Sequence, residues 1–170
     1  DQSNKFNDAI PLFDYWSAKG VSFLARFSAN FLSTGQSYTL SLYDIFQRKE
    51  IYSDEGILNP QRIRALGHQL SDKMFKKIRG ADSIFTSQIV FVSDRTSYNK
   101  EINKELYIMD FDGKNVRRLT SHKGTVISPA ISYDKRYILY SMISNVASRT
   151  RNLNLYVYDS LNRRSRLISS

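Results

Sequence analysis

Apolar and polar residues alternate along the first third of the chain, with the period of two that is typical of β-strands with one buried face. The alternation runs from Val21 to Phe31 and begins again from Tyr38 to Phe46, after a turn at residues 33–36. We expect these segments to pair as a hairpin, with a third short strand at residues 50–53 and a short helix before them at residues 11–19. The residues placed on the buried face of the first strand are Val21, Phe23, Ala25, Phe27, Ala29 and Phe31.

The period of the pattern changes after residue 58, which indicates an amphipathic helix. Asn59 is suited to accept a hydrogen bond from a free amide of the first turn, and Pro60 fits the first helical position. The predicted helix runs from Gln61 to Arg79 and ends at Gly80. Its apolar face is formed by Ile63, Leu66, Gly67, Leu70, Met74 and Ile78.

Beyond Gly80 the helical pattern stops, and short runs of β-forming residues recur between turn residues. We therefore expect a boundary near residues 81–86 and two domains, at residues 1–82 and 83–170. The predicted fold class is α+β, with an α/β module first and an all-β domain after it. The expected strands of the second domain cover residues 87–93, 105–111, 116–120, 137–142, 154–159 and 166–169.

The second half of the chain contains an internal repeat of 49 residues, or 48 for its last segment. The matching pairs are Leu106–Asp110 with Leu155–Asp159, Ile89–Phe91 with Ile138–Tyr140, and Arg118–Thr120 with Arg166–Ile168. About four short strands per repeat is typical of a β-propeller blade, although a β-sandwich stays open. Because propellers close with about four to eight blades, we expect a fragment of a longer protein, with assembly from several copies as the alternative.

The order of these parts and the amino-acid sequences of several segments resemble those of the TolB family, the periplasmic components of the Tol-Pal envelope system. The resemblance covers nearly the whole chain. The segments that carry it are Trp16–Val21, Arg64–Lys73, Gly80–Ser93, Glu105–Gly113, Arg117–Thr120 and Ser128–Ala130.

The resemblance implies an anticodon-binding-like N-terminal α/β domain, of which residues 1–82 would be the C-terminal part. Residues 83–170 would be the first blades of a six-bladed, WD40-like propeller. The implied function is that of a non-enzymatic periplasmic scaffold for protein interactions, which maintains outer-membrane integrity and supports envelope constriction during cell division. The implied partners are the peptidoglycan-associated lipoprotein (Pal) and TolA, whose main contact regions lie outside this chain. No cofactor or metal is implied, and no partner-binding residue can be assigned.

Two turns depart from the family pattern. The family's Trp-Ser-Pro-Asp-Gly is replaced by residues 131–135, which read Ile-Ser-Tyr-Asp-Lys. The segment 159–162 lacks the usual glycine, and Asn162 is expected to take the left-handed conformation in its place.

Composition and charge narrow the possible functions. The 170 residues include no cysteine, which excludes disulfides and thiolate sites, and no apolar run is long enough to span a membrane. The net charge of +9 invites a nucleic-acid interpretation. However, the basic residues are spread along the chain, with a single tight cluster at Arg163, Arg164 and Arg166, and no RNA-binding motif is present. Nucleic acid is therefore not the expected partner.

Few residues suggest chemistry. His68 and Asp72 share a helix face, and His122 lies in an apparent loop, but structural or solvated roles are expected for all three. The segment Asp110–Gly113 resembles half of a calcium loop, yet no later glutamate completes it, so a hairpin turn is expected. Because Asp159 recurs at the position of Asp110, the repeat predicts a structural hydrogen-bonding role for both.

Two alternatives concern recognition and class. The aromatic residues Phe13, Tyr15 and Trp16 could form an exposed recognition patch, although core packing is favoured. The blades could also belong to the gating propeller of a serine peptidase, which would need a Gly-x-Ser-x-Gly motif that does not occur here. The helix that contains residues 64–73 favours the scaffold, so no enzymatic activity is expected.

Overall fold

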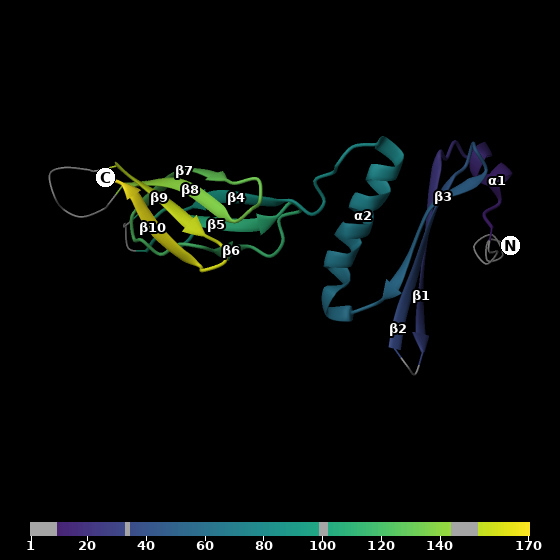
Figure 1. The fold of residues 1–170 in the computed structure, drawn as a ribbon, viewed down its shortest axis with the longest axis horizontal. Helices are drawn as coiled ribbons and strands as arrows, with labels where there is room; N and C mark the ends of the chain where they lie inside the picture. The colour runs from purple at the N-terminus through teal and green to yellow at the C-terminus, as the bar shows by residue number, and fades with distance from the viewer. Residues whose placement is uncertain (1–9, 33–34, 99–101, 144–152) are drawn as a thin grey trace. The chain divides into compact units, whose positions relative to one another are not determined.

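The computed structural model describes residues 10–32, 35–98, 102–143 and 153–170, and it forms two compact units, residues 1–86 and 87–170 (Figure 1). Antiparallel sheets dominate the described residues, and helices are few. This confirms the β-rich composition expected of the fold.

The first unit contains helix α1 (Phe13–Ala18) and the three strands β1 (Phe23–Leu32), β2 (Gly35–Asp44) and β3 (Lys49–Ile57), which we call the N-terminal sheet. Strand β2 lies in the centre and is antiparallel to both neighbours. The predicted hairpin of β1 and β2 is therefore confirmed, and β3 is longer than the expected residues 50–53.

The helix predicted from the change of period is confirmed. A 3-10 turn, η2 (Pro60–Arg62), leads into α2 (Ile63–Arg79). The Asn59 side chain accepts a hydrogen bond from the Gln61 amide at 3.0 Å. Gly80 ends the helix with a φ of 68°, a left-handed conformation that glycine adopts at little cost.

Helix α2 covers the β2 and β3 side of the N-terminal sheet. The core between them consists of Tyr38, Leu40, Leu58 and Leu70, with Tyr52, Leu66 and Met74 packed against it. The apolar residues of β1 lie on the same face, but β1 is an edge strand beyond this core. Phe23, Phe27 and Phe31 are 36%, 49% and 68% exposed, so the prediction that they are buried is wrong.

The second unit contains two antiparallel sheets. Sheet I has the order β4-β5-β6, and sheet II has the order β10-β9-β8-β7. The strands of sheet I are β4 (Gln88–Ser93), β5 (Glu105–Asp110) and β6 (Arg117–Arg118). The strands of sheet II are β7 (Thr125–Ile131), β8 (Tyr137–Ile143), β9 (Leu153–Asp159) and β10 (Arg164–Ser169).

The repeat in the sequence is also a repeat in strand pairing. Phe91 of β4 lies opposite Tyr107 of β5, and 49 residues later Tyr140 of β8 lies opposite Tyr156 of β9. The two ring pairs are stacked, with centroids 5.7 Å and 5.6 Å apart. Each sheet therefore carries the same aromatic pair at its centre.

The outer strands differ from the expected offset of 48 residues. Tyr107 is paired with Arg118, and Tyr156 is paired with Leu167, so the offset of 49 continues into β6 and β10. The resemblance of Arg118 to Arg166 in the sequence does not correspond to equivalent pairing. Arg117 and Arg166 are the equivalent arginines, since they lie opposite Ile108 and Val157.

Strand β7 was not among the expected strands, and it contains a proline, a residue that disfavours strands. The structure accommodates Pro129 through a β-bulge, where pairing with β8 shifts between Ile127 and Ala130. Ser128 within the bulge has a φ of 52°, which is unusual for a residue other than glycine. Strand β7 gives sheet II a fourth strand that sheet I lacks.

Sheets I and II pack face to face around one core. Its buried members are Leu106, Val126, Ile138, Tyr140, Met142 and Tyr158, and Val90, Val92, Leu119 and Tyr156 pack against them. These residues come from both sheets, so the second unit is held together by contacts between its two layers.

Candidate interaction site

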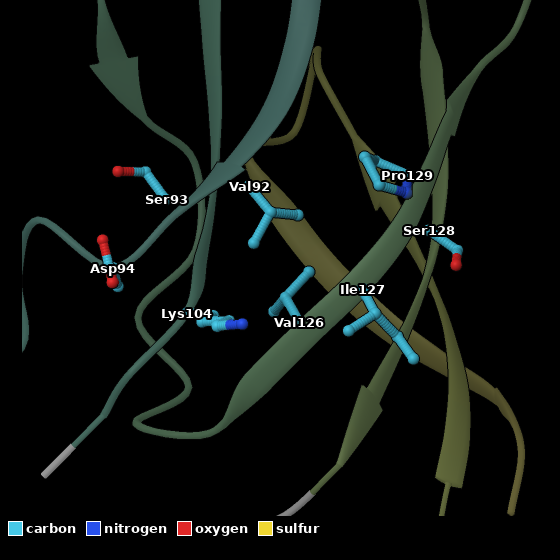
Figure 2. Close-up of a pocket in the computed structure, with 8 residues that line it drawn as sticks. All are labelled: Val92, Ser93, Asp94, Lys104, Val126, Ile127, Ser128 and Pro129. Carbon is cyan, nitrogen blue, oxygen red and sulfur yellow. The ribbon is translucent and has the colours of Figure 1, made fainter.

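A groove lies where the end of β4 approaches β7, between sheets I and II (Figure 2). Its volume is about 500 Å³. Val92 and Val126 point toward each other at its floor. The residues that line it are Val92, Ser93, Asp94, Lys104, Val126, Ile127, Ser128 and Pro129.

The backbone of Lys104 fixes β7 beside sheet I. The Lys104 amide donates a hydrogen bond to the Gly124 carbonyl at 2.8 Å, and the Lys104 carbonyl accepts one from the Val126 amide at 2.9 Å. Gly124 approaches a neighbouring strand closely, because a Cβ atom there would lie 2.9 Å from the Ile143 carbonyl oxygen. The position of the groove wall thus depends on a glycine.

The lining of the groove combines apolar and polar residues. Its apolar lining residues are Val92, Val126, Ile127 and Pro129, and its polar ones are Ser93, Asp94, Lys104 and Ser128. In Figure 2 the Ser93 and Ser128 hydroxyls point away from the two valines. None of the lining residues is a histidine or cysteine that could form a nucleophile–base pair with these hydroxyls. The apolar part of the groove has room for a small apolar group.

His122 lies in a polar and aromatic cluster on sheet II. Its Nε2 is 2.6 Å from the Tyr140 hydroxyl, which donates a hydrogen bond to Ser165 Oγ at 2.7 Å. Burial lowers the pKa of His122, while the carboxylate of Glu105 opposes that shift. Burial also raises the pKa of Tyr140 to about 12. The cluster therefore joins β8 and β10 with a neutral imidazole, as the expected structural role requires.

Glu105 is a buried carboxylate with two partners. Its oxygens accept hydrogen bonds from Thr120 Oγ1 at 2.6 Å and from the Lys123 amide at 2.8 Å. Thr120 Oγ1 in turn accepts one from the Leu106 amide at 2.9 Å. This network fastens the segment after β6 to the start of β5.

The first unit contains a half-buried carboxylate with three partners, which sequence reasoning did not single out. Asp54 accepts hydrogen bonds from Tyr38 at 2.8 Å, from Tyr52 at 2.5 Å and from Lys73 at 2.6 Å. The Lys73 ammonium, followed by the Tyr52 hydroxyl, lowers the pKa of Asp54 to about 2. Because Lys73 is on α2, the carboxylate ties the helix to the N-terminal sheet.

The structure gives Asp72 a role at the end of the first unit. Its carboxylate accepts hydrogen bonds from Ser83 Oγ and, at 3.1 Å, from the Phe85 amide. His68 is partly buried one turn earlier on α2. Asp72 thus stabilises the segment that follows the helix, in line with the structural role expected for it.

The segment Asp110–Gly113 forms a hairpin turn. The Gly113 amide donates to the Asp110 carbonyl at 2.9 Å, and Asn115 Nδ2 donates to Asp110 Oδ2 at 2.7 Å. In the second repeat Asn162 Nδ2 donates to Asp159 Oδ2 at 2.8 Å. Both aspartates therefore have the structural role predicted from the repeat. Across the described ranges, no group of three or more acidic or histidine residues could hold a metal ion.

The left-handed residue of the β9–β10 turn is not the expected one. Arg163 has a φ of 53°, and Asn162 uses its side chain to bind Asp159 instead. In the turn between β7 and β8, Lys135 takes the place of the family's glycine with a φ of 60°. Both turns therefore place a residue other than glycine in the left-handed region, which costs backbone strain.

The aromatic residues near the N-terminus are partly buried. Phe13 packs edge-on against Tyr43 at 6.3 Å between ring centroids, and Tyr15 packs against Trp16 at 5.1 Å. No residue of α1 is fully buried. The helix lies on the surface of the first unit with its aromatic rings half covered.

The groove and the Asp54 network depend on contacts between segments that are far apart in the sequence. Asp54 lies just beyond the strand predicted at residues 50–53, so the sequence did not place it beside the lysine of the helix. The groove had no signal in the sequence, because β7 itself was not predicted. No helix within the described part of the chain is long and apolar enough to cross a membrane.

Comparison with known proteins confirms the resemblance noted in the sequence. The chain is 33% identical over 137 residues to the Tol-Pal system protein TolB of Orientia tsutsugamushi (strain Boryong), which covers 80% of this chain and 30% of that protein. It is 29% identical over 152 residues to TolB of Zymomonas mobilis subsp. mobilis, covering 87% of the chain and 31% of the relative. The chain thus spans about 30% of the length of these curated relatives. No family model matches it.

The fold is similar to a solved structure. The crystal structure of TolB from Acinetobacter baumannii matches with a TM-score of 0.76 and 22% sequence identity, over 93% of this chain and 38% of that one. At this identity the match shows a shared fold.

Proposed function

Because this chain is related to TolB proteins over most of its length, we propose that it acts as a non-enzymatic scaffold of a Tol-Pal system in the periplasm. The observation that carries this proposal is the similarity to TolB sequences across both units. In this role the protein would help to couple the energised complex of the inner membrane to Pal. It would thereby maintain outer-membrane integrity and support constriction during division.

The structure supports a scaffold in two ways. Stacked sheets with a shared core provide a rigid surface, and the groove beside β7 is lined by both apolar and polar residues. We propose that residues 1–82 are the C-terminal part of an α/β domain and that residues 83–170 are the opening blades of a propeller. Pal and TolA are the proposed partners of the complete protein.

The proposal is tested by affinity purification of the product of the native gene, in its natural length, with purified Pal and TolA. The 170-residue chain is run beside it, with TolB of Acinetobacter baumannii as the positive control. We expect the native product to retain Pal, and the 170-residue chain to retain less or none. If neither partner is retained at any protein concentration that suffices for the control, the Tol-Pal role is rejected.

A second experiment tests the location. Osmotic release of the periplasm from the native cells should free the protein together with periplasmic marker enzymes. Recovery with cytoplasmic markers alone would contradict the proposed compartment while leaving the fold assignment intact.

A further inference from the structure

Strand β10 is the last strand of sheet II, and one of its edges meets no other strand among the described residues. Its other edge is paired with β9 from Arg164 to Leu167, before a bulge shifts the register. An edge strand of this kind presents backbone amide and carbonyl groups that can pair with an added strand.

Two arginines lie on the same face of this edge strand. Arg164 and Arg166 are two positions apart, which is the spacing that places side chains on one face of a strand. Both are exposed. They line a hollow of about 530 Å³ together with Ser165, Asp159 and Asn162.

The acidic residue beside these arginines is already engaged. Asp159 accepts hydrogen bonds from the Leu161 amide at 2.9 Å and from Asn162 Nδ2 at 2.8 Å, and it lies 3.7 Å from Arg136. Both arginines line the hollow, and among the described residues neither is paired with a carboxylate.

The charge of the surrounding unit determines which ligand fits this edge. Residues 87–170 contain 14 basic and seven acidic side chains, and the equivalent outer strand of sheet I carries Arg117 and Arg118. Two copies of this edge would repel each other, so a second copy of the chain is disfavoured as the occupant. A carboxylate fits, because a guanidinium can bind it through two parallel hydrogen bonds.

We propose that β10 binds an extended acidic segment of another protein, which adds along the open edge and places its carboxylates on Arg164 and Arg166. Backbone pairing supplies the direction of the segment, and alternate acidic residues supply the selectivity. Binding at β10 goes beyond the proposed scaffold role and does not depend on it, since β10 and the hollow can bind an acidic segment without Pal or TolA.

The test uses the full 170-residue chain and a fluorescent ten-residue peptide in which glutamate and threonine alternate, with binding followed by anisotropy. A peptide with lysine in place of each glutamate is the charge control. A glutamate peptide with N-methylated backbone amides on one edge tests strand pairing. We expect the glutamate peptide to bind, the lysine peptide not to bind, and N-methylation to weaken binding by about tenfold.

Two matched variants separate a local site from general attraction. Arg164→Gln with Arg166→Gln removes two charges from β10, and Arg117→Gln with Arg118→Gln removes two from β6. We expect the β10 variant to lose about tenfold or more in affinity and the β6 variant to lose less than about threefold. Circular dichroism of both variants shows whether the fold is retained.

Three results would overturn the proposal. They are the absence of glutamate-peptide binding by the folded chain, equal loss in the two double variants, and binding that N-methylation leaves unchanged. None of these results bears on Pal or TolA, so the failure of the β10 site and the failure of the Tol-Pal role are separately visible.

Discussion

Sheets I and II are two versions of one repeat, yet equivalent residues differ in burial. Leu106 of β5 is fully buried, whereas Leu155, which follows it by 49 residues, is only partly buried. The reverse holds on the opposite face, where Ile89 of β4 is 41% exposed and its equivalent Ile138 is 0% exposed. The strand pairing is the same in both sheets, so pairing does not account for the difference.

The difference follows from which face of each sheet meets the other. The face of sheet I that carries Val90 and Leu106 packs against the face of sheet II that carries Ile138 and Tyr140. Equivalent positions such as Leu106 and Leu155, or Ile89 and Ile138, thus have different environments. Strand pairing is specified by neighbours within each hairpin, whereas burial is specified by the layer that packs above it.

The aromatic pairs also differ in what covers them. In sheet I the guanidinium carbon of Arg95 lies 5.5 Å from the ring centre of Phe91 and 4.9 Å from that of Tyr107. In sheet II the ring of His122 lies 5.8 Å from Tyr140 and 5.3 Å from Tyr156. One pair is covered by a permanent cation and the other by a group that titrates.

The largest contrast between the sheets is expected at the equivalent leucines. Leu106→Ala leaves a cavity in the shared core and should lower the free energy of unfolding by about 3 kcal/mol. Leu155→Ala should cost less than about 1 kcal/mol, because that side chain is already partly solvated. Urea unfolding of both variants measures the difference. Equal losses would show that the faces are not distinguished by burial.

A smaller contrast is expected between Glu105 and its equivalent Asn154. Glu105→Ala removes the acceptor of Thr120 and of the Lys123 amide, and should cost about 2 kcal/mol. Asn154→Ala should cost less than about 0.5 kcal/mol, since its buried carbonyl oxygen has no hydrogen-bond partner among the described residues. Thermal unfolding followed by circular dichroism ranks the two variants. A larger loss for Asn154→Ala would reverse this assignment.

The contributions of His122 and Arg95 to the free energy of unfolding should depend differently on pH. Burial lowers the pKa of His122, so the folded state takes up its proton less readily than the unfolded state, whose pKa is near 6.5. Stability from this group is present above pH 6.5 and declines as the pH falls below it. His122→Phe should flatten the fall in unfolding free energy between pH 7.5 and pH 5, whereas Arg95→Ala should leave that slope unchanged. An identical slope in His122→Phe and the parent chain would contradict this expectation.

The smallest effects are expected in the equivalent turns. Arg163→Gly relieves a left-handed arginine in the β9–β10 turn and should raise the free energy of unfolding by about 0.5 kcal/mol. Gly113→Ala in the β5–β6 turn, where φ is 81°, should lower it by about 1 kcal/mol. Chemical unfolding at one temperature gives the sign of each change. A destabilised Arg163→Gly would mean that the arginine side chain contributes more than its backbone strain costs.

Features that depend on nearby residues were predictable from the sequence. The β1–β2 hairpin, helix α2 with its Asn59 and Gly80 ends, and the 49-residue register all follow from local periodicity and turn chemistry. The exposure of Phe27 and its neighbours was not predictable, because the pattern identifies an apolar face without saying how far the helix extends across it. The groove was not predictable either. It lies where two sheets meet at β7, a strand that was not predicted from the sequence.

The bulge in β7 gives sheet II a polarity. Pro129 cannot donate a hydrogen bond, Ser128 turns the backbone away from an extended path, and the start of the strand is already joined to Lys104. An added strand would therefore find fewer free backbone hydrogen-bonding groups along β7 than along β10. Of the two edge strands of sheet II, β10 is therefore the one better suited to pair with an added strand.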